Sequence, residues 1–298
     1  MGELLTEAMM YRFELANRRP RARWAVAGVL IVGLVGGCGE GGIAGSSAGG
    51  REPRDVLFDG SSKAQQAGSA RYVGTANPGL GQPINFQGTL SWKNGLTGEM
   101  TMTGSGLPGG GAVRITEDAL YTSIPSGLPG PSAGKQWGKF SYDDMAIVFG
   151  PVGKVFGAAL TQTNPVRTAA MLRQAGDLKL VGEEQRNGVA TRHFVGTIEP
   201  VKLVQDLKLG LTDEVIAELR REYQKAGISS EQLDVWLDEQ NLPVHVEAKT
   251  TDSTGRQVVY AADYADYGQP RQISPPSADE VYDLGEHWKS PLPASPPR

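Results

Sequence analysis

The sequence predicts an α+β protein organised around an antiparallel sheet. Stretches of alternating apolar and polar residues follow one another closely, short turns rich in Gly, Pro or Asn separate them, and stretches of helical periodicity lie between two such groups. Successive strands joined by connections this short pair as an antiparallel meander. The expected strands of the first group are 71–75, 84–93, 96–103, 112–116 and 120–124.

Two Asn-Gly pairs mark expected hairpins. Asn94-Gly95 lies between two strand patterns, and Asn187-Gly188 lies between 177–185 and 189–198. In a two-residue hairpin this pair favours positive φ at both positions, which matches the twist of the flanking strands. Four further short strands are expected at 137–140, 235–238, 244–250 and 257–264.

Helical patterns occupy the remaining segments. A first helix is expected at 54–70, with an interruption near Gly60. Residues 142–160 are the most apolar stretch after the N-terminal region; Asp143 and Asp144 can cap its start, and Gly150-Pro151 divides it into two short helices. Three more helices are expected at 165–175, 201–209 and 212–226.

The helix at 212–226 has the clearest signals at both ends. Thr212 can cap it, acidic residues follow at the positive end of its dipole, and Gly227 can end it. Its expected buried stripe consists of Val215, Ile216, Leu219 and Tyr223.

The N-terminal region carries an export signal. A basic segment, 18–23, precedes 14 uncharged residues, 24–37, which is shorter than the ~20 residues of a membrane-spanning helix. Val35-Gly36-Gly37-Cys38 resembles the bacterial lipobox, whose cysteine receives a diacylglyceryl group and becomes the new N-terminus. Cys38 is the only cysteine of the chain, so we expect lipidation there. A plain signal peptide or an uncleaved anchor is the alternative, and the export route, Sec or Tat, stays open.

Composition limits the partners of the exported part. The whole chain has a formal net charge of −4, and residues 1–37 hold five basic and three acidic residues, so the mature chain has a net charge of −6. This acidic balance argues against nucleic acid and against electrostatic binding to anionic lipid. With its one cysteine lipidated, the domain has no internal disulfide and depends on its core.

The second half of the chain resembles a known family. Three pieces carry the resemblance: GDLKLVGEE (176–184) with GVATRHF (188–194), VWLD (235–238) with LPV (242–244), and YADYG (264–268) with ISPP (273–276). Their order, together with the lipobox, is similar to that of LolA/LppX-like envelope lipoproteins of the LppX/LprAFG group. The resemblance implies a curved antiparallel half-barrel with helices packed on its concave face. For some members it also implies an apolar cavity that holds lipid or lipidated glycan, and it implies no catalytic residue.

These signals divide the chain into four parts. Residues 1–37 form the signal peptide, and 38–53, rich in Gly, Ser and Ala, form a flexible tether after the lipidated cysteine. The half-barrel domain is expected at 54–283, and 284–298 is expected to be a proline-rich tail; the whole stretch from 275 onward is expected to fray.

The apolar stretch at 142–160 suggests a ligand site. It carries more apolar residues than one short helix needs to cover one face. We expect it to line one wall of an apolar cavity, with flexible methionines of the sheet on the other side. The candidate cavity residues are Met100, Met102, Ile147, Phe149, Val152, Phe156 and Leu160. The alternative is that they fill the half-barrel as ordinary core.

Catalytic and metal-binding patterns are not found in the sequence. His193, His245 and His287 have no second ligand at metal-binding spacing, and His245, between two valines of a strand, is expected to be solvated or hydrogen-bonded. The segment 130–136 fails as a phosphate loop in glycine spacing and in its last residue. No enzyme, cofactor or metal is therefore expected.

Two functions stay open. The first is a membrane-anchored lipoprotein that binds or carries a lipid or glycolipid at the outer face of the cell membrane. The second is a structural or protein-interaction lipoprotein, with a filled half-barrel and an envelope protein as partner.

Overall fold

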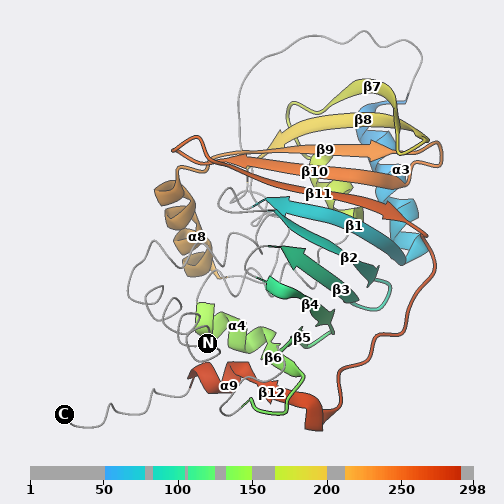
Figure 1. Cartoon of the computed structure of the whole chain (residues 1–298). Coiled ribbons are helices and arrows are strands. Elements are labelled where there is room, and N and C mark those ends of the chain that lie inside the picture. Colours follow the sequence, from blue (N-terminus) through green and yellow to red (C-terminus); the bar gives the residue numbers. More distant parts are fainter. Residues whose placement is uncertain are drawn as a thin grey trace.

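The computed structural model describes residues 51–77, 83–104, 107–124, 132–149, 165–199 and 212–289 (Figure 1). These residues form one 12-stranded sheet with the order β12-β6-β5-β4-β3-β2-β1-β11-β10-β9-β8-β7. The first half of the chain contributes β1 (Ser69–Asn77), β2 (Ile84–Ser91), β3 (Thr97–Gly104), β4 (Leu107–Ile115), β5 (Ala119–Ser123) and β6 (Trp137–Ser141). The second half contributes β7 (Lys179–Arg186), β8 (Val189–Ile198), β9 (Glu231–Leu237), β10 (Pro243–Thr251), β11 (Gln257–Ala265) and β12 (Val281–Asp283).

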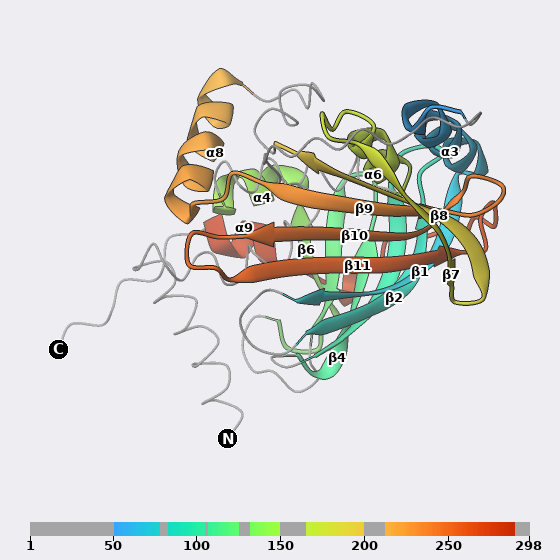
Figure 2. The same cartoon turned by 90° about the horizontal axis from the view of Figure 1, so that it is seen from above.

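The sheet is antiparallel, curved and unclosed. Every neighbouring pair is antiparallel except β12 and β6, which are parallel. Strands β7 and β12 form the two edges and do not pair with each other. Figure 2 shows β9, β10 and β11 running across the molecule while β1, β2 and β4 turn away from them. The two halves of the chain join where β1 pairs with β11, in a register that places Tyr72 opposite Tyr264. The predicted α+β class and antiparallel meander are thus confirmed.

One of the two predicted hairpin turns is confirmed. Asn187 and Gly188 have φ values of 51° and 80°, as a two-residue turn between β7 and β8 requires. The prediction is wrong for Asn94, because only Gly95 has a positive φ there. Ser91 pairs with Thr97, so the connection has five residues and does not need the two-residue turn. Its first and last residues, Trp92 and Leu96, are buried in the core.

The first helix, α3 (Pro53–Ala67), is uninterrupted, so the predicted break near Gly60 is wrong. Gly60 is buried, and a Cβ atom added there would lie 2.5 Å from the carbonyl oxygen of Asn241. The glycine therefore allows α3 to approach the β9–β10 turn closely. Asn241 also donates a hydrogen bond to Asp59 of the same helix. The helix ends at Gly68, which has the left-handed conformation typical of a C-terminal glycine.

The other helices lie near the predicted positions. They are α4 (Tyr142–Phe149), α6 (Pro165–Leu172) and α8 (Asp213–Ala226). Gly227 ends α8 in the left-handed conformation, whereas Thr212 occupies the N-cap position without a side-chain capping bond. In the expected stripe of α8, Tyr223 is buried and Ile216 is half-buried. The expected helix at 201–209 and the second half of 142–160 lie outside the described residues.

The expected fraying of the C-terminal segment is wrong for residues 278–289. A short 3₁₀ turn, η1 (Ala278–Glu280), leads into β12 and then into α9 (Leu284–Lys289). A side chain at Gly138 of β6 would collide with Leu284, and one at Gly285 would collide with Asp144 of α4. The two glycines therefore let α9 pack closely against β6 and α4. The expected tail boundary at 284 cuts through this packed unit.

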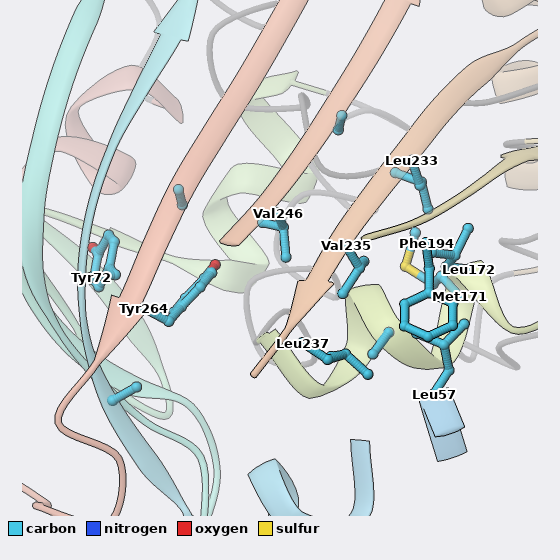
Figure 3. Packing of buried hydrophobic residues seen from close by; sticks show 14 of the residues in the cluster. Leu57, Tyr72, Met171, Leu172, Phe194, Leu233, Val235, Leu237, Val246 and Tyr264 are labelled. Carbon is cyan, nitrogen blue, oxygen red and sulfur yellow. The ribbon is translucent and has the colours of Figure 1, made fainter. Parts of the chain in front are cut away.

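The core lies between one face of the sheet and the helices α3 and α6. These helices contact each other, and α6 contacts β8, β9 and β10. Figure 3 shows Phe194 of β8 beside Leu172 and Met171 of α6, with Leu57 of α3 next to them. Further along the same face lie Val235 and Val246, followed by Tyr264 and Tyr72. We call this the apolar face, defined by Tyr72, Phe86, Val113, Phe194, Val235, Val246 and Tyr264; the opposite face is called the outer face.

Candidate functional site on the apolar face of the sheet

Strand alternation places the two candidate methionines on the apolar face. Met100 pairs with Val113 on one side and with Gly88 on the other, and Met102 pairs with Phe86. Both methionines are half-buried and pack against the core. Because Met is flexible and polarisable, this part of the face can adapt to apolar groups of different shape.

Aromatic rings continue this surface across β1, β2 and β11. The ring centroids are 5.7 Å apart for Tyr72 and Phe86, 5.4 Å for Phe86 and Tyr260, and 6.4 Å for Tyr72 and Tyr264. Glycine makes room for this packing, since a Cβ atom at Gly74 would lie 2.5 Å from the ring of Phe86. Such ring pairs contribute about 0.5–1.5 kcal/mol each beyond their buried area.

The tyrosines bring polar atoms into this apolar surface. Burial raises the pKa of Tyr72, Tyr260 and Tyr264, so all three stay neutral over the physiological pH range. The Tyr72 hydroxyl is buried and has no hydrogen-bond partner among the described residues. A buried hydroxyl without a partner costs free energy, and a polar group of a bound molecule can supply the missing bond.

Helix α4 packs at the β5–β6 end of this surface, where Leu120 contacts both the main core and the small cluster beside α4. Its buried residue Met145 packs with Phe140 of β6, and Leu120 and Leu284 lie beside them. Ile147 points outward, with 64% of its surface exposed, and does not join the described core. Phe149 is the last residue of α4. The candidates Val152, Phe156 and Leu160 lie outside the described residues, so their place in a cavity stays a prediction.

The outer face carries a polar cluster that the sequence did not predict. The Trp236 ring stacks on His193 at 4.0 Å and meets His245 edge-on at 4.9 Å, and the Arg186 guanidinium lies 4.3 Å from its centre. His193 Nε2 lies 2.7 Å from Asp234 Oδ1. His193 and His245 meet Trp236 because they lie directly opposite it in the pairing of β8, β9 and β10. The spacing of these residues in the sequence does not show this cross-strand register.

His245 is buried and hydrogen-bonded, which agrees with one of the two expectations for it. Its Nδ1 atom lies 2.6 Å from Asp263 Oδ1, and its Nε2 atom lies 2.5 Å from Arg186 and 3.3 Å from Glu247. The hydrogen bond with His245, followed by that with Lys249, lowers the pKa of Glu247 to about 2. Among the described residues, no group of three or more His, Cys, Asp or Glu side chains is placed to hold a metal ion.

The outer face also has a groove of about 470 Å³ across β1, β2, β3 and β4. Three arginines, Arg71, Arg114 and Arg271, line it together with Glu99 and Trp137. A second groove of about 370 Å³ lies at the β7 edge, between acidic residues of β7 and of the segment after β9. Within the described ranges, no helix has the length and apolar character needed to cross a membrane.

Comparison with known proteins gives distant relatives. No family model matches the chain. An uncharacterised 31.2 kDa protein of Streptomyces griseus is 28% identical over 236 residues, covering 75% of this chain and 76% of that protein. A Streptomyces coelicolor protein named "Putative lipoprotein SCO4650" is 27% identical over 231 residues, covering 74% of this chain and 71% of that protein.

Solved structures with a similar arrangement include two mycobacterial proteins, LprF and the lipoprotein LppX. LprF from Mycobacterium bovis has a TM-score of 0.48 and 13% identity, and the match covers 78% of this chain and 100% of that one. LppX from Mycobacterium tuberculosis has a TM-score of 0.45 and 13% identity, with 74% of this chain and 98% of that one covered. The chain is similar to each of these two structures over nearly the whole of that structure's chain.

Proposed function

We propose that this protein is an exported lipoprotein, anchored through Cys38 to the outer face of the cell membrane, that binds a lipid or lipidated glycan on its apolar face. The observation that carries the proposal is the combination, on one face, of adaptable methionines, packed aromatic rings and the unpartnered Tyr72 hydroxyl. Ligand sites are mostly apolar and aromatic, with a few polar groups that fix the orientation of the ligand.

The acyl part of the ligand would lie against Met100, Met102 and Phe86, and a polar group would accept the hydrogen bond that the Tyr72 hydroxyl can donate. The half-barrel would curve around this surface, with the helices on its concave side. Val152, Phe156 and Leu160 would close it from the segment after Gly150-Pro151. The name of the Streptomyces coelicolor relative as a lipoprotein supports the anchoring part of the proposal.

A second function rests on how well the apolar face is filled. The rings of Phe86 and Tyr260 stack at 5.4 Å, and Phe194 is only 1% exposed beneath α6. Most residues that line the first groove belong to the outer face, although Tyr72, Met100 and Val113 also border it, and the second groove lies at the β7 edge. If side chains fill the half-barrel completely, the protein is a structural or protein-interaction lipoprotein whose partner is another envelope protein.

The anchor is tested by replacing Cys38 with Ala and separating membranes from soluble material. Because one acyl chain holds only weakly and two or three hold stably, loss of the lipidated cysteine should release the protein or stall its processing. A Cys38→Ala variant that is processed normally and stays in the membrane fraction would show that the anchor lies elsewhere.

Ligand binding is tested by replacing Phe156 with Trp and measuring the lipid that copurifies. We expect the larger ring to lower the recovered lipid by reducing the space for it. Phe58→Trp is the matched control, because Phe58 lies on α3 with 56% of its surface exposed. Equal lipid recovery from both variants and the unchanged protein would favour the filled half-barrel.

A further inference from the structure

The groove on the outer face is a separate site, because the sheet lies between it and the apolar face. Two cross-strand rows form its floor and walls. One row runs from Arg71 through Thr89 and Glu99 to Arg114, and the other runs from Val73 through Gln87 and Thr101 to Ala112. Tyr72, Met100 and Val113 also border the groove, but they alternate with these positions, so their side chains point to the apolar face.

The groove is basic in an acidic protein. Its three arginines face a single acidic lining residue, Glu99, whereas the whole chain has a net charge of −4. Arg271 comes from the segment between β11 and η1, and its Nη1 atom donates to Glu99 Oε1 at 2.9 Å. Arg71 donates from Nε to Asp266 Oδ2 at 2.6 Å. Each of these contacts uses one donor of a guanidinium that has five.

Arg114 is held by an aromatic ring. Its guanidinium lies 4.7 Å from the centre of the Trp137 ring. Among the described residues, no carboxylate forms an ion pair with Arg114. A guanidinium stacked on a ring is fixed in orientation while the edges that carry its donors stay available, and this geometry suits a carboxylate or phosphate.

The strands under the groove have no free edge. Strands β1, β2, β3 and β4 are all internal to the sheet, so each pairs with a neighbour on both sides. An extended peptide therefore cannot bind here by adding a strand, and recognition must come from side chains. The neutral ones, Gln87, Thr89 and Thr101, donate and accept hydrogen bonds as sugar hydroxyls do.

We propose that this groove binds an acidic glycan, a short chain of sugars that bear carboxylate or phosphate groups. The three arginines bind the acid groups, and the Gln and Thr side chains bind the hydroxyls. The volume of about 470 Å³ lies within the range of ~300–1,000 Å³ that is usual for ligand sites. The site is independent of lipid binding on the apolar face, and either can fail without the other.

The test measures binding of trigalacturonate to the full chain in detergent by titration calorimetry. Galactotriose is the neutral counterpart, triglutamate is an acidic peptide of the same charge, and inorganic phosphate is the simple anion. We expect saturable binding of trigalacturonate alone, weakened when salt rises from about 0.05 M to about 0.5 M, because salt screens exposed charges.

Two groove variants and one control complete the design. Arg114→Gln and Arg271→Gln should each weaken trigalacturonate binding by about tenfold or more, as expected for loss of a charge-assisted hydrogen bond. Arg256→Gln should change it less than about twofold, since Arg256 pairs with Asp252 at 2.7 Å, away from the groove. If Arg114→Gln does not fold, Arg271→Gln decides alone, because its side chain is 69% exposed.

Several results would overturn the proposal. Absence of trigalacturonate binding would do so. A loss of trigalacturonate affinity in Arg256→Gln equal to that in the two groove variants would also do so. Galactotriose binding as tightly as trigalacturonate would remove the role of the arginines. Equal binding of triglutamate or inorganic phosphate would mean that the groove recognises a peptide or a simple anion in place of a glycan.

Discussion

Replacing Tyr72 with Phe should stabilise the protein that has no ligand bound. The Tyr72 side chain is 3% exposed, and its hydroxyl is buried without a partner among the described residues. An unsatisfied buried hydroxyl costs about 1–3 kcal/mol, and Tyr72→Phe removes this group while keeping the ring against Phe86 and Tyr264. We therefore expect the free energy of unfolding to rise by about 1–3 kcal/mol.

Tyr142→Phe is the matched control, with the opposite sign. The Tyr142 hydroxyl donates to the carbonyl oxygen of Thr116 at 2.8 Å, so its loss should cost about 0.5–1.5 kcal/mol. Urea unfolding of delipidated protein measures both variants. If Tyr72→Phe destabilises the protein as Tyr142→Phe does, then the Tyr72 hydroxyl makes a stabilising bond inside the protein, and the argument that it is available to a ligand is wrong.

Three further changes test the fold and its electrostatics. Phe194→Ala should cost about 3–5 kcal/mol in urea unfolding, because the ring is 1% exposed beneath α6, whereas Phe58→Ala at an exposed site should cost less than about 1 kcal/mol. Gly60→Ala should destabilise the protein, despite the higher helix propensity of Ala, because the new Cβ atom would lie 2.5 Å from the carbonyl oxygen of Asn241. Gly182→Ala is the control, because open space surrounds Gly182. Equal losses of stability in the two variants would refute the packing argument. The pKa of the Glu247 carboxyl is lowered to about 2, so its carboxylate stabilises the fold fully above the usual pKa of 4.5, and this contribution is lost as the pH falls towards 2. The acid limb of the stability–pH curve should therefore be flatter for Glu247→Gln than for the unchanged protein. An acid limb with the same slope in both proteins would contradict the lowered pKa.

The strands were predictable because their signal is local. Alternation in 84–93 and 189–198 reflects one buried face, and β2 and β8 lie there in the structure. Asn187-Gly188 was also predictable, since two residues join strands that pair directly. Asn94 was not, because the burial of Trp92 and Leu96 lengthens that connection, and burial of a turn depends on the rest of the fold.

The errors at Gly60 and at the C-terminus have one physical origin. Glycine in a helix pattern and proline in a tail usually mark breaks, but here Gly60, Gly138 and Gly285 are places where two elements approach closely. Such contacts join residues far apart in the chain, which local propensity does not report.

The outer-face sites depend on register in the same way. The positions of Val235 and Leu237 in the core require Trp236 to face outward, which alternation predicts. That His193 and His245 lie directly across from it follows only from the pairing of β8, β9 and β10. The three arginines of the groove likewise come from β1, β4 and the segment after β11. Met100 and Met102 lie on the apolar face of the sheet, and their part in binding a lipid stays a prediction.

Native mass spectrometry of the protein purified from its own membrane tests the central claim most directly. We expect one copurified lipid or lipidated glycan per chain, in addition to the acyl groups on Cys38, and we expect its loss when the purified protein is delipidated. A mass that corresponds only to the chain and its covalent acyl groups, under conditions in which a known lipid-binding protein keeps its ligand, would contradict it.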